Sequence, residues 1–211
     1  MFHNAQVKIF FILFFFNPTT GFSEATSFEQ AQFFYEAEQF EDAFKALARL
    51  RSTNDPRVFN LLGNHYFFGE FVDQNFEAAK NYYKKASEFD YGPAITTLGL
   101  MYEQGNFFEV NIVEANKLYF QAHDLGDDRA TYFLAVNIQF GAGIEQNAKR
   151  SIAFYEEAIR RGNESAVIDL AFFYVEEEFG IQDYKKAYNL FKSLADKGVA
   201  DAQYNIGKMY E

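Results

Sequence analysis

Two glycines, Gly141 and Gly143, stand directly before a predicted helix, a spacing that could cradle a phosphate. A dinucleotide-binding turn needs a third glycine where this chain has Gln146, and the Gly-Lys-Ser/Thr sequence of a P-loop does not follow. Glu145 would also repel an anion at the point where a phosphate would bind. The glycine pair is therefore interpreted as a turn rather than as a phosphate site.

Two histidines and two acidic stretches are the remaining candidates for chemistry outside the first 25 residues. Neither His65 nor His123 has a His or a carboxylate at a helical ligand spacing, so packing or surface roles are predicted for them. The acidic stretches 124–128 and 175–180 lack the alternating oxygen ligands of a calcium loop and are interpreted as solvated loops. With no Cys and no recognisable pair of nucleophile and base, the sequence predicts no catalytic, cofactor-binding or metal-binding residue and no enzyme.

Composition limits the classes of partner. The 211 residues carry a formal charge of −11, whereas phosphate binding needs Lys and Arg gathered on one face. An apolar fraction of 49% is ample for a packed core. Nucleic acid is therefore not a predicted partner, and a folded chain is expected.

The first 25 residues have the three-part layout of a secretory signal peptide. Lys8 precedes an apolar run over 9–16, and Ser23 and Ala25 fit the small positions before a cleavage point. The run is well short of the ~20 residues that span a bilayer. The sequence thus predicts cleavage after Ala25, export from the cytoplasm and no stable membrane span afterwards, with an uncleaved membrane anchor as the alternative.

The rest of the chain repeats with a period of 36 residues, which predicts a helical repeat array. Each copy contains, in phase, a small residue, a pair similar to Leu98-Gly99, a large aromatic residue and in most copies a closing glycine. The small residues are Ala94, Ala130, Ala166 and Ala202, the aromatic residues are Tyr83, Tyr119, Tyr155 and Phe191, and the closing glycines are Gly126, Gly162 and Gly198. The small residues are predicted where neighbouring helices approach closely, and the aromatic residues in the core.

Each copy is expected to fold as two antiparallel helices, the first of them covering 57–68, 93–104, 129–140 and 165–176. An Asn or Asp is predicted to cap the second helix, at Asn75, Asn111, Asn147 and Asp183. The predicted fold class is all-α, a right-handed superhelical solenoid of antiparallel helix pairs, with repeats at 57–92, 93–128, 129–164 and 165–200. Residues 26–56 are interpreted as a degenerate hairpin that caps the array, and 201–211 as the first helix of a further repeat or a C-terminal cap.

The pattern is similar to that of the Sel1-like repeats, which are related to tetratricopeptide arrays. AITTLGLMYEQG from Ala94 and AQYNIGKMY from Ala202 match the first half of that repeat, and EANKLYFQAHDLG from Glu114 matches the second half. The second glycine of the turn survives only as Gly143, and its place is taken elsewhere by Phe71, Phe107 and Phe179. The turn backbones are therefore expected to differ between copies.

The resemblance implies a non-enzymatic scaffold or adaptor that binds a protein or peptide outside the cytoplasm, as a bacterial periplasmic or secreted protein. Two alternatives stay open: an endoplasmic-reticulum luminal adaptor in protein quality control, and a hydrolase, an activity assigned to some Sel1-like proteins. Asn163 begins an N-glycosylation sequon in a turn predicted to be exposed, which has a meaning only in a eukaryotic secretory lumen.

The concave side of such an array is lined by its first helices, whose side chains off the packing stripe project into the groove. These positions are predicted to bind the partner and are called the groove residues: Leu61, Asn64, Phe68, Thr97, Leu100, Gln104, Phe133, Val136, Phe140, Asp169, Phe172, Glu176, Asn205 and Lys208. The four phenylalanines among them predict an apolar groove. The alternative is that these rings pack between repeats and enlarge the core. In tetratricopeptide arrays an Asn at one of these places contacts the peptide backbone, and Asn205 alone keeps it here.

Overall fold

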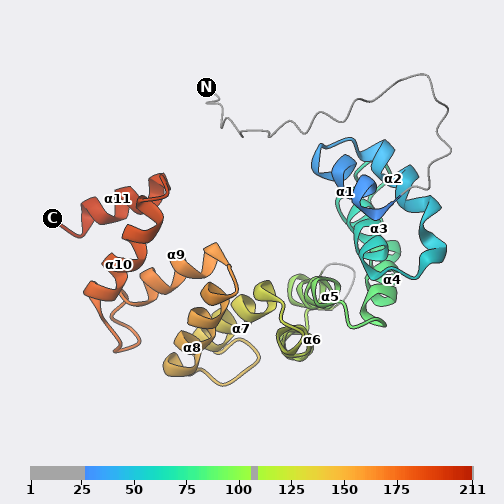
Figure 1. Ribbon diagram of the computed structural model, residues 1–211. Helices are drawn as coiled ribbons and strands as arrows, with labels where there is room; N and C mark the ends of the chain where they lie inside the picture. The colour runs from blue at the N-terminus through green and yellow to red at the C-terminus, as the bar shows by residue number, and fades with distance from the viewer. Residues whose placement is uncertain (1–26, 106–108, 211) are drawn as a thin grey trace.

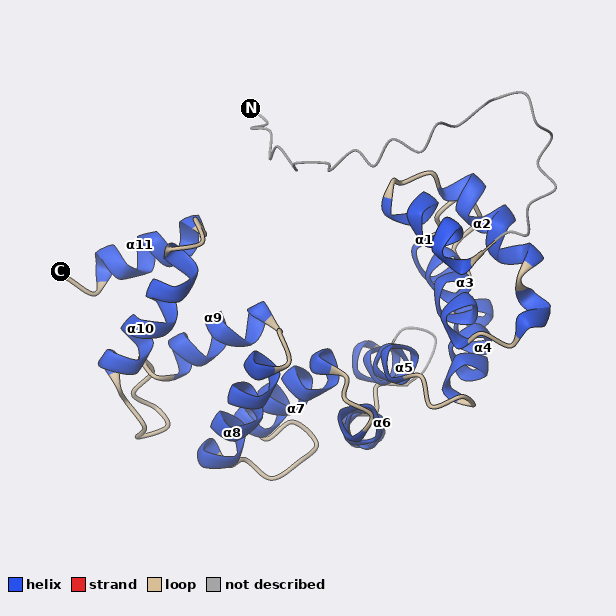
Figure 2. Cartoon of the chain, in the orientation of Figure 1, coloured by secondary structure: helices blue, strands red, loops and turns tan. Residues whose placement is uncertain are grey.

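The computed structural model describes residues 27–105 and 109–210, so the predicted signal peptide lies outside the described residues. Within these ranges the regular structure is helical and contains no strand (Figure 2). The first helices of the copies are α3 (Pro56–Phe68), α5 (Gly92–Gln104), α7 (Asp128–Phe140) and α9 (Glu164–Phe173), and the second helices are α4 (Phe76–Ser87), α6 (Ile112–Asp124), α8 (Ala148–Arg160) and α10 (Tyr184–Ala195). Each series starts at intervals of 36 residues, and the predicted all-α solenoid of helix pairs is confirmed.

Further helices flank the four copies. α1 (Phe28–Glu36) and α2 (Phe40–Arg49) form a hairpin, the 3-10 turn η1 (Arg51–Thr53) leads into α3, and α11 (Ala200–Lys208) follows α10. The helices follow one another around an arc, with α1 and α2 at one end and α10 and α11 at the other (Figure 1). Along this arc α3, α5 and α7 lie on the inner side of α4, α6 and α8. The first helices therefore form the concave face.

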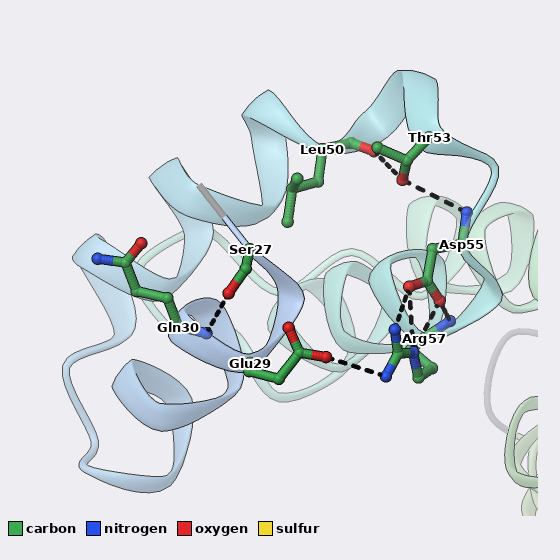
Figure 3. A network of polar contacts seen from close by, with 7 residues as sticks. All are labelled: Ser27, Glu29, Gln30, Leu50, Thr53, Asp55 and Arg57. Atoms are coloured by element: carbon green, nitrogen blue, oxygen red, sulfur yellow. Dashed lines mark hydrogen bonds and ion pairs between the residues drawn. The ribbon is translucent and has the colours of Figure 1, made fainter. Parts of the chain in front are cut away.

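Arg57 on α3 links the N-terminal hairpin to the first copy (Figure 3). Its guanidinium donates to Asp55 (Nη2 to Oδ2, 2.6 Å) and to Glu29 Oε1 on α1 (3.4 Å), and lies 4.2 Å from the ring centroid of Phe28. The hydrogen bonds from Arg57 hold the pKa of the Asp55 carboxyl below its ordinary value. Because exposed ion pairs contribute little, the hairpin is held mainly by apolar burial of Ala31, Ala46 and Leu47 with Val58 and Leu62.

The predicted caps of the second helices are confirmed. The side-chain oxygens of Asn75, Asn111, Asn147 and Asp183 each accept a hydrogen bond from the backbone N–H three residues on, at 2.9–3.0 Å. This satisfies an amide that the helix itself leaves unpaired. The closing glycines adopt left-handed φ angles of 88–100°, and Asp90, with a φ of 53°, takes the equivalent place in the first copy.

The turn between the two helices has similar left-handed positions in the first and third copies. Gly69 and Gly141 end α3 and α7 in the left-handed conformation, with φ of 74° and 69°. Two residues later, Phe71 has a φ of 66°, close to the 64° of Gly143. The prediction that the turns differ is therefore wrong for these two copies. Phe71 keeps the conformation although it costs about 1–2 kcal/mol in a residue with a side chain.

A glutamine that the repeat comparison missed helps to hold this turn. Gln74 donates its side-chain amide to the carbonyl of Phe67 (2.8 Å), and Gln146 donates to that of Gln139 (2.9 Å). In both copies the backbone N–H of the N-cap residue also donates to a carbonyl of the first helix. These bonds tie both ends of the turn to the first helix and explain why Phe71 accepts the strain.

The fourth copy departs from this turn, and its first helix is shorter than predicted. α9 ends at Phe173 rather than near residue 176. Glu177 stands where the other copies have the glycine that closes the helix, and a side chain disfavours that left-handed conformation. The left-handed residue occurs later, at Gly180 with a φ of 62°. The acidic residues Glu176, Glu177 and Glu178 are exposed, as predicted for a solvated loop.

The core between the helices contains the aromatic side chains that the period predicts. Tyr83, Tyr119, Tyr155 and Phe191 are at most 2% exposed. The first-helix glycines make room for these rings: a methyl group on Gly99 would come within 2.5 Å of Cε1 of Tyr119. The prediction of close helix contacts at small residues is confirmed at this position.

The acidic stretch 124–128 is only in part the solvated loop that was predicted: Asp124 is exposed, whereas Asp127 and Asp128 are not. Asp127 caps α7 by accepting the N–H of Ala130 (2.8 Å), and its Oδ1 also accepts the hydroxyl of Thr96 from α5 (2.8 Å). Asp128 accepts the side-chain amide of Asn163 (2.9 Å). Both aspartates are half-buried because neighbouring copies stack there, a tertiary contact that local composition does not show.

Asn163 is likewise more enclosed than predicted for its sequon. It is half-buried, and its Oδ1 accepts the N–H of Ala166 (3.0 Å) while its Nδ2 donates to Asp128. Both polar atoms of the side chain are therefore engaged in capping α9 and joining it to α7.

Candidate interaction surface on the concave face

The groove residues lie on the accessible side of the first helices and of the turn after α9, and none is buried. Phe140 on α7 and Phe172 on α9 contribute exposed apolar side chains. The exposed members are Phe68, Gln104, Phe140, Phe172, Glu176 and Lys208, and the remaining members are half-buried. Their role in binding a partner stays a prediction.

The four groove phenylalanines are not equivalent. Phe68, Phe140 and Phe172 are 60%, 61% and 42% exposed, which is unusual for rings of this size. Phe133 instead stacks on Tyr119, with ring centroids 5.1 Å apart, and packs against the core. Core packing, the alternative considered for all four rings, thus describes Phe133, whereas the other three leave apolar surface on the array.

Three groove residues come together around a hollow of about 450 Å³ between α9, α10 and α11. Phe172, Asn205 and Lys208 line it together with Val175, Tyr184, Phe191 and Met209. A second hollow, of about 360 Å³, adjoins Leu61 where α1 meets α3. Both lie within the size range of ligand pockets in proteins, and the first combines apolar walls with one amide and one ammonium group.

Tyrosine hydroxyls form hydrogen bonds to polar side chains of the first helices and hold them in place. Tyr83 donates to Asn64 (2.9 Å), Tyr119 to Glu103 (2.6 Å) and Tyr155 to Gln139 (2.7 Å). Each bond runs from a buried tyrosine on the second helix of a copy to the first helix of the same copy. In addition, Tyr132 on α7 donates to Asp169 on α9 (2.7 Å) and so links adjacent copies.

These tyrosines are neutral hydrogen-bond donors rather than bases. Burial raises the pKa of Tyr119, and the hydrogen bond to the Glu103 carboxylate raises it further. Burial and then the bond to Asp169 raise the pKa of Tyr132 in the same way. In the part of the chain that the structure describes, no three His, Cys, Asp or Glu side chains group closely enough to hold a metal.

His65 has a packing role, as predicted, in the cluster that joins α1, α2 and α3. It is fully buried, and its Nδ1 lies 2.9 Å from the carbonyl oxygen of Glu70. Since a carbonyl can only accept, Nδ1 carries the proton, and the buried Nε2 has no hydrogen-bond partner among the residues that the structure describes. Rings of Tyr35 and Phe44 approach the imidazole at centroid distances of 5.2 and 5.3 Å. His123 also packs, 5.1 Å from Phe154.

We expect His65 to make the stability of the array depend on pH. Burial lowers the pKa of this imidazole below its ordinary 6.5, so below about pH 6.5 the unfolded chain takes up a proton that the folded chain does not. Stability is then complete above that pH and falls as the pH decreases toward the folded-state pKa, by at most about 1.4 kcal/mol per pH unit for this one group. Urea unfolding at a series of pH values measures the slope.

The matched control is His65→Asn. Its side-chain amide can still donate a hydrogen bond to the backbone carbonyl of Glu70, but it cannot be protonated. The variant should lose part of the slope between pH 7.5 and pH 5.5, whereas His123 still titrates in both proteins. An unchanged slope in His65→Asn would show that the buried imidazole is not the source.

Stacked antiparallel helix pairs that present a continuous inner face define the class of protein, a helical-repeat scaffold. The sequence profile described as Sel1 repeat matches residues 60–88, 93–127, 128–163, 165–199 and 200–211. The chain belongs to the Sel1 repeat family.

Solved structures support the same fold. A Sel1 repeat protein from Oxalobacter formigenes is 29% identical with a TM-score of 0.77, over 89% of this chain and 74% of that one. A putative Sel1 repeat protein from Klebsiella pneumoniae has a TM-score of 0.59 over 87% and 91%, and at 12% identity the likeness concerns the fold alone.

Two curated relatives from fungi match part of the chain. Chitin synthase regulatory factor 2 of Schizosaccharomyces pombe is 31% identical over 130 residues, which are 59% of this chain and 25% of that protein. Chitin synthase regulator SKT5 of Malassezia restricta is 31% identical over 123 residues, 56% of this chain and 8% of that protein. The chain thus spans a quarter or less of the length of these relatives.

Proposed function

We propose that this chain is a non-enzymatic adaptor that binds a protein partner along its concave face. The observation that carries the proposal is the exposure of Phe140 and Phe172, which extend from the first helices of neighbouring copies, with the 450 Å³ hollow at Phe172. Covering a ring of this size with a partner contributes about 1.5–3 kcal/mol. A protein segment laid across α7, α9 and α11 can cover both rings at once.

The names of the fungal relatives support a regulatory adaptor rather than a catalyst. Both proteins are named as regulators of a chitin synthase, and Sel1 repeats make up most of this chain. A repeat array acts on another protein by holding it, which needs surface and rigidity but no reacting group. We therefore place the specificity of this chain in the side chains of its inner face.

Paired serine variants test the concave site. Phe140→Ser and Phe172→Ser are each expected to weaken binding of a partner captured from the native source by roughly 30-fold, the effect of losing a hot-spot residue worth about 2 kcal/mol. Val113→Ser is the matched control, because Val113 is 55% exposed on the outer helix α6 and should not affect capture. Thermal midpoints of all three variants should stay near that of the parent.

A large drop in the thermal midpoint of both Phe variants would mean that these rings belong to the core. Equal loss of capture in Val113→Ser would show that the partner does not use the concave face. Either result contradicts the proposed site.

We further propose that the chain acts outside the cytoplasm, as a periplasmic or secreted protein, after cleavage following Ala25. The signal-like layout of residues 1–25 supports this, and the lumen of the endoplasmic reticulum is the alternative compartment. Within the described residues, no helix is long and apolar enough to cross a bilayer. N-terminal sequencing of the chain from its native source should begin at Thr26, whereas Met1 retained on a membrane-bound chain would favour the anchor instead.

A further inference from the structure

An apolar groove lies on the outer face of the array, between the second helices α8 and α10. Its volume is about 390 Å³, and it is lined by Leu170 and Tyr174 from the region of α9, Ile159 from α8 and Leu190 from α10. Arg160 and Lys186 stand at its rim, with Glu156 and Asn189 beside them. This groove is separate from the concave face and from the function proposed for it.

The equivalent groove one copy earlier, between α6 and α8, is filled by aromatic side chains. Phe120 and Phe154 meet edge to face with ring centroids 6.1 Å apart, and Arg150 covers the Phe120 ring at 5.4 Å. In the later groove the corresponding positions, 36 residues on, hold Glu156 and Leu190. The missing rings leave a space of the kind that one aromatic side chain fills in the earlier groove.

The charge of this outer face is opposite to that of the whole chain. With their cap residues, α8 and α10 carry a net charge of +3, from +7 and −4. The basic residues are Lys149, Arg150, Arg160, Arg161, Lys185, Lys186 and Lys192, and the acidic residues are Glu156, Glu157, Asp183 and Asp196. The whole chain carries −11. The groove therefore suits an acidic segment with an aromatic anchor.

Such a segment is present at the other end of the chain, on α1. Phe33 is 64% exposed, and Glu29 and Glu36 lie four residues before it and three after it, on the same side of the helix. Glu38 and Asp42 extend the acidic surface into the next turn and α2. α1 and α10 lie at opposite ends of the arc, so the two surfaces of one copy cannot meet (Figure 1).

We propose that α1 of one copy docks into the groove between α8 and α10 of a second copy. Phe33 enters the apolar groove. Glu36 and Glu29, of which Glu29 also accepts from Arg57 of its own copy, face Arg160 and Lys186 at the rim. Because the two surfaces differ, the contact is head to tail, and repeated use of it builds an open chain of copies. The resulting assembly displays the concave faces of several copies.

Sedimentation velocity of the purified chain over a range of concentrations tests this directly. Association should increase with concentration and weaken roughly tenfold from low to high salt, because opposite charges face each other across the contact. Phe33→Ser should abolish it, and so should the double variant Lys186→Glu/Asn189→Glu, which places carboxylates at the rim. Phe140→Ser, a change of similar exposure on the concave face, is the matched control and should associate like the parent.

Mixing the two defective proteins gives the sharpest result. Phe33→Ser keeps its groove and Lys186→Glu/Asn189→Glu keeps its α1, so the mixture should form a 1:1 complex that does not grow beyond two copies. All changed residues are exposed, and circular dichroism confirms that each variant remains folded.

Three results would overturn the proposal: a chain that stays monomeric at every concentration, association that neither variant affects, or a mixture that forms no complex. A monomeric chain that binds a synthetic peptide of residues 27–41 in the groove would assign it to an acidic segment of another protein instead. Binding to phosphatidylglycerol vesicles that the rim variant abolishes would assign it to a lipid surface and equally exclude the second copy.

Discussion

Replacing Gly99 with leucine is expected to lower the free energy of unfolding by about 3 kcal/mol, the upper end of the usual cost of overpacking a core. The Cβ of the new side chain would lie 2.5 Å from Cε1 of Tyr119, and that ring is fully buried. The helices α5 and α6 would have to move apart to admit the side chain. Urea unfolding followed by circular dichroism measures the change.

Gly207 provides the matched control, because it occupies the same register in α11, and in the described part of the chain a Cβ added at this glycine would have no neighbouring atom within 4 Å. Gly207→Leu should be neutral or stabilising by up to about 1 kcal/mol, since leucine favours the helix more than glycine does. If the two variants changed stability equally, the requirement for a small residue would not come from the helix contact.

Removing the ring that Gly99 accommodates should have a still larger effect. Tyr119→Ala is expected to destabilise by about 3–5 kcal/mol, the range for deleting a buried aromatic side chain. The variant loses the stack on Phe133 and the 2.6 Å hydrogen bond to Glu103 as well as the buried ring itself. Tyr184→Ala, at a tyrosine 54% exposed on α10, should change stability far less.

The double variant Gly99→Leu/Tyr119→Ala tests whether the two effects share one space. The leucine can enter the cavity that the missing ring leaves, so the double variant should be less destabilised than the sum of the single variants, by about 1–2 kcal/mol. Additive effects would place the two residues in separate environments.

Most of the architecture follows from one regularity of the sequence. The period of 36 residues gives the helix pairs, and the recurring Asn or Asp gives the start of each second helix, because capping is a local interaction of neighbouring residues. The period of 36 residues does not predict where α9 ends. There Glu177 interrupts the pattern, and the place where the chain leaves the helix depends on which later residue can adopt a left-handed φ.

Comparing the copies of the repeat did not predict most of the polar contacts between the helices. Tyr119 and Tyr155 bond side chains 16 residues before them, but the partner of Tyr83 lies 19 residues before it. Asp127 resembled a loop residue and yet joins α5 to α7. Such pairs depend on which side chains tertiary packing brings together, so a spacing that holds in two copies fails in another.

The candidate surface was predictable as a face but not residue by residue. The register places Phe133 and Phe140 both off the packing stripe. However, Phe133 stacks on Tyr119 of the preceding copy while Phe140 is 61% exposed. Exposure at such positions depends on which side chains of neighbouring helices lie against the ring in the folded chain. The outer groove between α8 and α10 arises from the same cause.

The hydrogen bonds between neighbouring first helices give the arc an uneven resistance to pulling. Asp127 with Thr96, Asn163 with Asp128 and Tyr132 with Asp169 join α5, α7 and α9 through half-buried contacts. In the turn before α11, Lys197 pairs with Glu164 of α9, but this pair is exposed, so water and salt weaken it. A tension applied between the two ends would therefore lengthen the C-terminal end before the middle. The centre of the arc should therefore keep its curvature under a force that already straightens the C-terminal end.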